Sequence, residues 1–165
     1  MRRPRPIAPG PGQESVWDYP RPAILQPVAR TLEVVFAGRT IARTTRGHRV
    51  LETSHPPTYY LPPDDVLPGI LRRLDGMTTC EWKGRACYFD VVVDGLTAHR
   101  GAWSYPITTP PFDAMKDHIG FYAGRVDACF VDGEQVVAQP GDFYAGWITR
   151  EVVGPFKGGP GTWGW

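Results

Sequence analysis

Three turns that end in glycine, each set between two runs of apolar and β-branched residues, constrain the fold of this chain more than any other feature. They are Ala37-Gly38, Asp94-Gly95 and Asp132-Gly133. Both central residues of a tight hairpin turn need a positive φ, which glycine adopts without cost and aspartate tolerates. The turns therefore predict antiparallel hairpins over residues 32–44, 86–99 and 127–138.

The connections between these hairpins must carry the remaining elements. Residues 64–74 begin with carboxylates and end with arginines, and residues 111–119 open on proline and stop at Gly120, so each segment predicts a short helix. Helices this short are not stable alone and should lie on a sheet. With 165 residues, 42% of them hydrophobic, the chain suits a single packed domain. We expect a mainly β fold: a compact antiparallel domain with two short helices.

The two ends of the chain differ in composition from its middle. Residues 1–13 are rich in Pro, Gly and Arg and are predicted to be disordered, leaving residues 14–165 as the domain. No apolar stretch follows the basic start, so we expect no signal peptide, no membrane span and a cytoplasmic protein. The tail, residues 154–165, carries Phe156, Trp163 and Trp165 and is expected to pack on the domain or on the second subunit of a homodimer.

Charge and cysteine content restrict the partners. The net charge of +1 does not call for a nucleic acid or a membrane, and we expect neither. Residues 1–50 are basic, which leaves open a contact with an acidic partner or arginines scattered on exposed strands. Cys80, Cys87 and Cys129 form no C-x-x-C pair, so no disulfide framework, structural zinc or other cofactor is predicted. Cys87 and Cys129 have apolar neighbours and are expected to be buried thiols.

Glu52 and His55 are the first candidates for chemistry. They lie three residues apart on a segment that Pro56 and Pro57 restrict. A carboxylate beside an imidazole can orient its tautomer and raise its basicity, as a general base requires. The alternative is that Glu52 pairs with a nearby arginine and His55 is a turn residue.

Lys83 is the third candidate, because the chain has three lysines against fifteen arginines. A lysine between Trp82 and Gly84 indicates that a compact ammonium is needed, for an anion contact, an ion pair with Glu52 or a base. An ordinary surface lysine is the alternative. The same reasoning applies more weakly to Lys157.

Several aromatic side chains could line a cleft for a small polar molecule or a cage for a cation, although they could equally form the core. We expect Glu52, Lys83 and Trp103 to share one cleft, because they lie at the ends of separate hairpins. The candidate ligand-binding residues are Tyr59, Tyr60, Cys80, Trp82, Trp103, Tyr105 and Lys157.

Six segments together resemble a known family, the domain of unknown function 427. They are Trp17-Asp18-Tyr19-Pro20-Arg21-Pro22, residues 51–62, 79–84 and 102–106, Phe121-Tyr122-x-x-Arg125-Val126-Asp127 and residues 154–161. The resemblance extends from about residue 14 to the C-terminus. It implies a compact β-rich fold of the β-tent type, found mainly in bacteria, without an established activity. Where the family often has Cys-Pro-Tyr-Lys-Gly, this chain has Cys80-Glu81-Trp82-Lys83-Gly84.

The family also carries a nucleotidyltransferase-like label. That chemistry needs a Gly-Ser pair at the phosphates and an Asp-x-Asp pair that holds Mg²⁺. The sequence has no Gly-Ser dipeptide, and Asp64 and Asp65 are adjacent. We therefore do not expect nucleotidyl transfer.

Two functional hypotheses remain. The first, which we favour, is a module that binds a small polar metabolite in an aromatic-lined cleft. The second is an enzyme that uses Glu52, His55 and Lys83 for acid–base chemistry on a small substrate. Perturbed pKa values in a shared cleft would favour the enzyme, and widely separated positions would exclude it.

Overall fold

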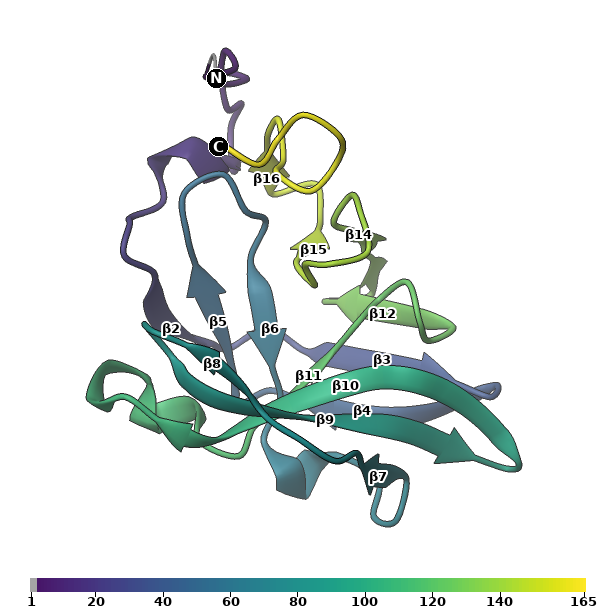
Figure 1. Cartoon of the computed structure of the whole chain (residues 1–165). Coiled ribbons are helices and arrows are strands. Elements are labelled where there is room, and N and C mark those ends of the chain that lie inside the picture. Colours follow the sequence, from purple (N-terminus) through teal and green to yellow (C-terminus); the bar gives the residue numbers. More distant parts are fainter. Residues whose placement is uncertain (1–2) are drawn as a thin grey trace.

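The computed structural model describes residues 3–165 and shows a mainly β molecule built from several small sheets (Figure 1). Strands hold 44% of the chain and helical turns 7%, so the mainly β prediction is confirmed. The strands pair antiparallel except for the pair of β1 and β16. The β-tent comparison stays an implication of the family resemblance.

The largest sheet has five strands and contains the second predicted hairpin. Its order is β11-β10-β9-β7, and β8 also pairs with β9. Asp94 and Gly95 have φ values of 50° and 80°, so the predicted turn joins β9 to β10. The strands are β7 (Leu71–Arg73), β8 (Thr78–Cys80), β9 (Gly84–Val93), β10 (Leu96–Thr108) and β11 (Ile119–Phe121).

The other two predicted hairpins lie together in a four-stranded sheet of order β13-β12-β3-β4. Ala37-Gly38 and Asp132-Gly133 both have positive φ, which confirms these turns. A three-stranded sheet of order β2-β5-β6 stands beside the long strands β9 and β10 (Figure 1). These strands are β2 (Ile24–Val28), β3 (Leu32–Phe36), β4 (Arg39–Thr44), β5 (Gly47–Leu51), β6 (Thr58–Tyr60), β12 (Ala128–Val131) and β13 (Glu134–Gln135).

Two short pairs and three single 3₁₀ turns complete the described part of the chain. The parallel pair joins β1 (Glu14–Ser15) to β16 (Val152–Val153), and the antiparallel pair joins β14 (Val137–Ala138) to β15 (Trp147–Ile148). The 3₁₀ turns are η1 (Val16–Asp18), η2 (Pro63–Asp65) and η3 (Pro110–Met115).

The two predicted helices occur only as the short turns η2 and η3. Gly69 has a φ of +79°, which ends any helix, and the chain continues as β7, whose Leu71 pairs with Val91 of β9. Asp65 does not cap a helix; its carboxylate accepts a hydrogen bond from Thr44 at 2.6 Å. Strand pairing therefore replaces the weak helical preference of the segment.

The apolar side chains form a main core between the sheets and two smaller clusters. Backbone hydrogen bonds between Leu61 and Ile119, of 2.8 and 2.7 Å, connect the three-stranded sheet to the five-stranded sheet. The angle between these sheets is occupied by the cluster that contains Tyr60, Trp103 and Tyr105. This arrangement brings β5, β6, β8 and β10 around one space.

The beginning of the described chain lies near the C-terminal tail (Figure 1). Residues 3–13 form no strand, and the Ile7 N–H donates to the Gly154 carbonyl at 2.8 Å. The predicted disorder of residues 1–13 stays a prediction, and its part on residues 1 and 2 lies outside the described residues. In the tail, Trp165 packs on Trp17 with ring centroids 5.7 Å apart, whereas Trp163 is 71% exposed. Trp163 is therefore not buried within this chain, and the alternative that the tail packs on a second subunit stays a prediction.

Cys87 and Cys129 are buried free thiols, as expected, and Cys80 is half-buried. Burial raises the pKa of both buried thiols. No helix between residues 3 and 165 has the length and hydrophobicity to cross a membrane. Over the same residues, no three His, Cys, Asp or Glu side chains converge in a way that could hold a metal ion.

Candidate functional site

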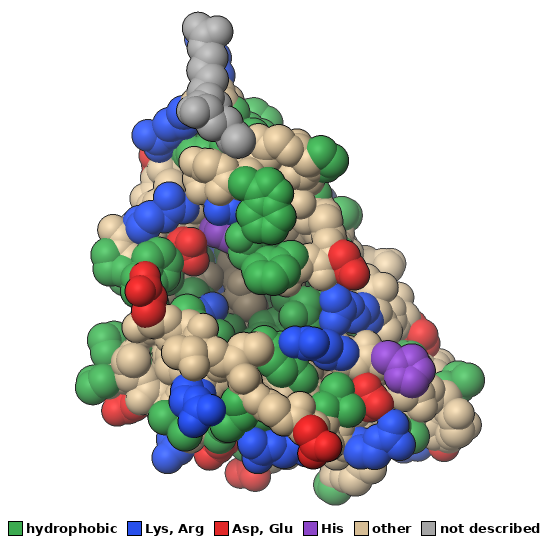
Figure 2. Space-filling model, in the orientation of Figure 1, with side chains coloured by type: hydrophobic (Ala, Val, Ile, Leu, Met, Phe, Trp, Pro, Cys, Tyr) green, Lys and Arg blue, Asp and Glu red, His purple; other side chains and the backbone are tan. Residues whose placement is uncertain are grey.

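The space between the sheets is an open cavity of about 670 Å³, which we call the central cleft. Small-molecule sites commonly have volumes of ~300–1,000 Å³. The space-filling view shows a hollow with apolar side chains inside and charged side chains around it (Figure 2). The central cleft contains eight of the ten predicted site residues: Glu52, His55, Tyr60, Cys80, Trp82, Lys83, Trp103 and Tyr105.

One side of the cleft is formed by aromatic side chains that pack around Trp103, and we call it the aromatic wall. In the register of the sheet, Trp103 lies between Tyr88 of β9 and Gly120 of β11. A Cβ on Gly120 would be 2.4 Å from the Trp103 indole, so the missing side chain gives this ring its place. Tyr60 and Tyr122 pack on the indole with centroid distances of 5.6 and 4.9 Å. The planes of Tyr60 and Tyr122 are inclined to the indole by 81° and 57°, so the wall is built from tilted rings that pack together.

Lys83 is placed by the tight connection between β8 and β9. Gly84 has a φ of +129°, and a Cβ there would be 2.0 Å from the Ile107 carbonyl oxygen, so only glycine allows this approach to β10. The Thr109 N–H donates to the Lys83 carbonyl at 3.0 Å and fixes the position of this connection. The Lys83 ammonium then lies 5.4 Å from the centroid of the Tyr105 ring.

The pKa of Lys83 lies above its ordinary value. Burial alone would lower the pKa of Lys83, but its interactions with Tyr60, Tyr105 and Cys80 act in the opposite direction. Within residues 3–165, no carboxylate lies at ion-pairing distance from this ammonium. The cleft therefore contains a positive charge that lacks a paired acid in the described chain.

Glu52 follows strand β5 and supplies a negative charge to the same cleft. Its carboxylate lies 3.3 Å from Nε2 of His55 and 3.8 Å from the Arg21 guanidinium. Burial raises the pKa of Glu52, but the hydrogen bond from His55 and the charges of Lys83 and Arg21 outweigh it, and the pKa is lowered. The Glu52 side chain is 23% exposed, so the carboxylate remains accessible to a ligand.

Gln139 determines which nitrogen of His55 carries the proton. The Gln139 oxygen accepts from the Gly146 N–H at 2.9 Å, and its nitrogen donates to the Lys157 carbonyl at 2.8 Å, which fixes the orientation of the amide. The same nitrogen lies 3.1 Å from Nδ1 of His55, so Nδ1 must accept. This geometry places the His55 proton on Nε2, which is directed at Glu52.

Two stacked arginines form the rim of the cleft and were not among the predicted site residues. The guanidinium of Arg100 lies 3.9 Å from the Tyr88 ring centroid, and that of Arg125 lies 3.9 Å from the Tyr122 centroid. Arg125 also donates to the Arg100 carbonyl at 2.9 Å. Arg125 could have been predicted as a site residue, because it belongs to the Phe121-Tyr122-x-x-Arg125 motif of the family resemblance. No sequence pattern indicated Arg100, because its position depends on a positive φ of 49°.

The loop from Gln139 to Ala145 closes one side of the cleft and was also missed. Asp142 accepts from Arg125 at 3.1 Å, and Tyr144 packs edge-on against His55 with centroids 4.7 Å apart. Gly141 and Gly158 bring this loop against the tail, because a Cβ on Gly158 would be 1.9 Å from the Pro140 oxygen. The tail therefore supports a wall of the cleft.

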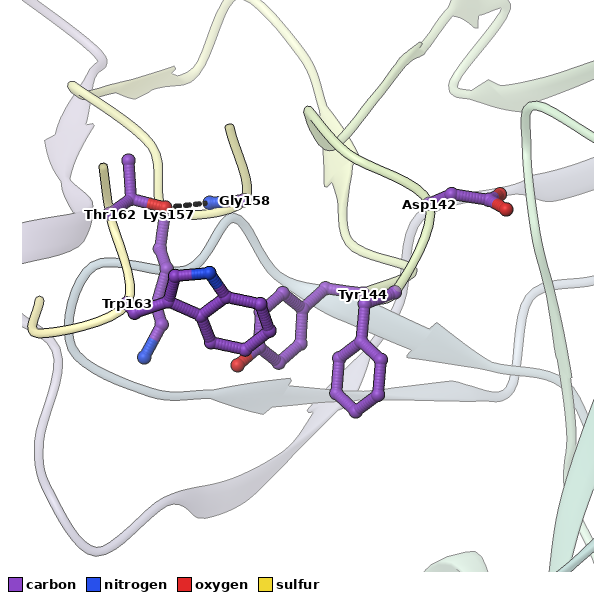
Figure 3. Close-up of a pocket in the computed structure, with 7 residues that line it drawn as sticks. Asp142, Tyr144, Lys157, Gly158, Thr162 and Trp163 are labelled. Carbon is purple, nitrogen blue, oxygen red and sulfur yellow. Dashed lines mark hydrogen bonds between the residues drawn. The ribbon is translucent and has the colours of Figure 1, made fainter. Parts of the chain in front are cut away.

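Two predicted site residues lie outside the central cleft. Tyr59 alternates with Tyr60 on β6, so it faces the main core, is 2% exposed and packs on Trp147. Lys157 lines an adjoining pocket of about 390 Å³, between the tail and the loop that carries Tyr144 (Figure 3). There its ammonium lies 5.7 Å from the Tyr144 ring centroid and donates to the Trp165 carbonyl at 3.2 Å. Trp163 lines the same pocket, and its ring centroid lies 6.3 Å from that of Phe143.

Comparison with known proteins is consistent with the family resemblance. The family model described as a domain of unknown function (DUF427) matches residues 24–132, roughly two-thirds of the chain. The matched part contains Glu52, Lys83 and Trp103, and it ends before the loop that begins at Gln139. A search of curated proteins found no significant match. The chain therefore belongs to the DUF427 family.

Proposed function

We propose that the central cleft binds a small polar molecule with a flat apolar ring. The observation that carries this proposal is that the Glu52 carboxylate and the Lys83 ammonium lie in one cavity, which is also lined by the aromatic wall around Trp103. Ligand sites typically combine an apolar surface with a few placed polar groups. A ring stacked on this wall could reach both charges with its substituents.

The same groups are less suited to proton transfer, which weighs against the acid–base enzyme. A general base works best with a pKa near the working pH. Glu52 and Lys83 do share a cleft and do have perturbed pKa values, which was the condition expected to favour the enzyme. However, the pKa of Glu52 is lowered and that of Lys83 is raised, so both shifts move away from neutrality. Both ring nitrogens of His55 are engaged, by Gln139 and by Glu52. We infer that His55 positions Glu52 rather than reacting itself.

Nucleotidyl transfer has no support from this arrangement either. Asp64 and Asp65 do not line the central cleft. The Asp65 carboxylate is engaged by Thr44 and by Arg46, at 2.6 and 3.2 Å. These contacts support a local structural role for Asp65.

The test is a screen of small ring compounds against ¹⁵N-labelled protein. We expect a subset of flat, polar-substituted rings to shift the indole N–H signals of Trp82 and Trp103 in a saturable manner. Trp82→Ala should weaken this binding, and Trp163→Ala, the same change at an exposed site outside the cleft, should not. The proposal is wrong if no compound saturates these signals, or if the two variants behave alike.

A further inference from the structure

The central cleft is lined by equal numbers of acids (Glu52, Glu81 and Asp142) and cations (Lys83, Arg100 and Arg125), but the ion pairing among them is uneven. Arg125 is paired with Asp142 at 3.1 Å, and Glu52 is paired with Arg21 at 3.8 Å and accepts from His55. Glu81 is exposed at the turn between β8 and β9. Among the described lining residues, Lys83 and Arg100 are the cations without an acidic partner.

The placement of Lys83 differs from that of a surface lysine. It is half-buried, and its ammonium lies over the face of Tyr105. A charge removed from water is costly unless it is paired. A ring quadrupole compensates only a part of that cost, so an anion in the cleft would add the missing partner.

We infer that the ligand of the central cleft is a small organic anion, whose carboxylate or phosphate pairs with Lys83 while its ring lies on the Trp103 wall. This inference rests on the proposed function and specifies the class of ligand. The Glu52 carboxylate, already satisfied by His55 and Arg21, then accepts from a donor on the ligand. Arg100 adds a second positive charge at the mouth, which attracts the anion during approach.

The experiment uses four probes with the same ring: benzoate, phenyl phosphate, benzamide and benzylamine. Their dissociation constants are measured by titration of the ¹⁵N-labelled protein. We expect one or both anions to bind about tenfold or more tightly than benzamide, because a hydrogen bond to a charged group contributes enough binding free energy for such a difference. Benzylamine should bind most weakly. If both anions bind equally, the acid group is recognised by its charge alone; a preference for one identifies the acid.

Variants assign the effect to Lys83. Lys83→Met keeps an apolar stem and removes the charge, so it should weaken anion binding about tenfold or more and leave benzamide nearly unchanged. Lys116→Met, at an exposed lysine outside the cleft, is the matched control and should change neither. If Lys83→Met does not fold, the wild-type protein still decides the question. Added salt should weaken the binding of benzoate and phenyl phosphate and leave the binding of uncharged benzamide unchanged.

The outcomes separate this inference from the function on which it rests. If none of the four probes saturates the Trp82 and Trp103 signals, and no compound in the wider screen does, the binding function itself fails. If benzamide or benzylamine binds as tightly as the anions, the cleft binds small rings but the inferred anion is wrong. Unchanged anion binding in Lys83→Met also overturns the inference.

Discussion

The side-chain nitrogen of Gln139 lies 3.1 Å from Nδ1 of His55, and both residues are buried. An amide nitrogen can only donate, so this contact excludes a proton on Nδ1. Gln139 also connects His55 to the loop through Gly146 and to the tail through Lys157. A single amide thus links the acid of the cleft to the C-terminal part of the chain.

The first prediction concerns the tautomer of His55. Ring ¹⁵N chemical shifts should show the proton on Nε2 and an unprotonated Nδ1. In Gln139→Glu the amide donor to Nδ1 is lost and a carboxylate takes its place, so the Nε2–H tautomer should no longer be favoured. The variant should also lose about 1–3 kcal/mol of stability, because the Lys157 carbonyl loses its donor. Gln135→Glu, at an exposed position, is the control. An Nδ1–H tautomer in the wild type would contradict the assignment.

The second prediction concerns the aromatic wall. Gly120→Ala places a methyl group 2.4 Å from the Trp103 indole and should destabilise the protein by about 1–3 kcal/mol. It should also displace the Trp103 indole N–H signal. Gly124→Ala is the matched control, because its Cβ would meet only Ala138, at an ordinary 3.7 Å. Equal unfolding midpoints for the two variants in urea would show that the wall tolerates the shift.

The third prediction concerns the tail. Deletion of residues 154–165 removes the carbonyl to which Trp17 Nε1 donates at 2.9 Å and the Lys157 N–H that donates to Ser54 at 2.9 Å. The melting temperature should therefore fall by several degrees or more. Trp163→Ser changes a residue that is 71% exposed and should alter stability by less than about 0.5 kcal/mol. An unchanged melting temperature after the deletion would mean that the tail does not support the domain.

A single substitution in the tail tests the contact between Gly158 and the loop at Pro140. Gly158→Ala would put a Cβ 1.9 Å from the Pro140 oxygen at a φ of +138°, so it should separate the tail from the loop. Gly159→Ala has 4.0 Å of space to its nearest neighbour and serves as the control. Ligand binding should weaken only in Gly158→Ala, because the loop with Tyr144 forms a wall of the cleft.

The fourth prediction concerns pH. Burial lowers the pKa of both His48 and His118, whose rings lie 5.1 Å apart, and the charge of His48 lowers that of His118 further. The folded state therefore binds fewer protons than the unfolded state, so stability is complete above the ordinary histidine pKa of 6.5 and decreases as the pH falls below it. Urea unfolding between about pH 7 and pH 5.5 should show this loss. His118→Gln should reduce it, whereas His99→Gln, at a residue with an 83% exposed side chain, should reduce it less.

The fifth prediction concerns the shape of the cation at position 83. Lys83→Arg keeps the charge, but the planar guanidinium is larger than the ammonium that lies over the Tyr105 ring. Benzoate binding should therefore be several-fold weaker than in the wild type, whereas Lys116→Arg should bind normally. Wild-type affinity in Lys83→Arg would mean that charge alone matters at this position.

The sequence by itself determined the features that depend on neighbouring residues. Asp94-Gly95 and the two similar turns need positive φ at adjacent positions, and no distant contact is required to recognise them. The apolar alternation of β9 and β10 is equally local, as is the burial expected of Cys87 and Cys129. The scarcity of lysine also singled out Lys83 without any structural information.

Only the tertiary structure determined which of the predicted site residues lie together in the central cleft. Tyr59 and Tyr60 must face opposite sides of β6, but the packing of the sheets decides that Tyr60 lines the cleft and Tyr59 the core. Residues 71–73 became a strand because β9 offers hydrogen bonds that outweigh a weak helical preference. Gln139 lies 84 residues from His55, so its control of the tautomer exists only in the folded chain. Contacts over such separations depend on how whole sheets pack, and local patterns do not contain that information.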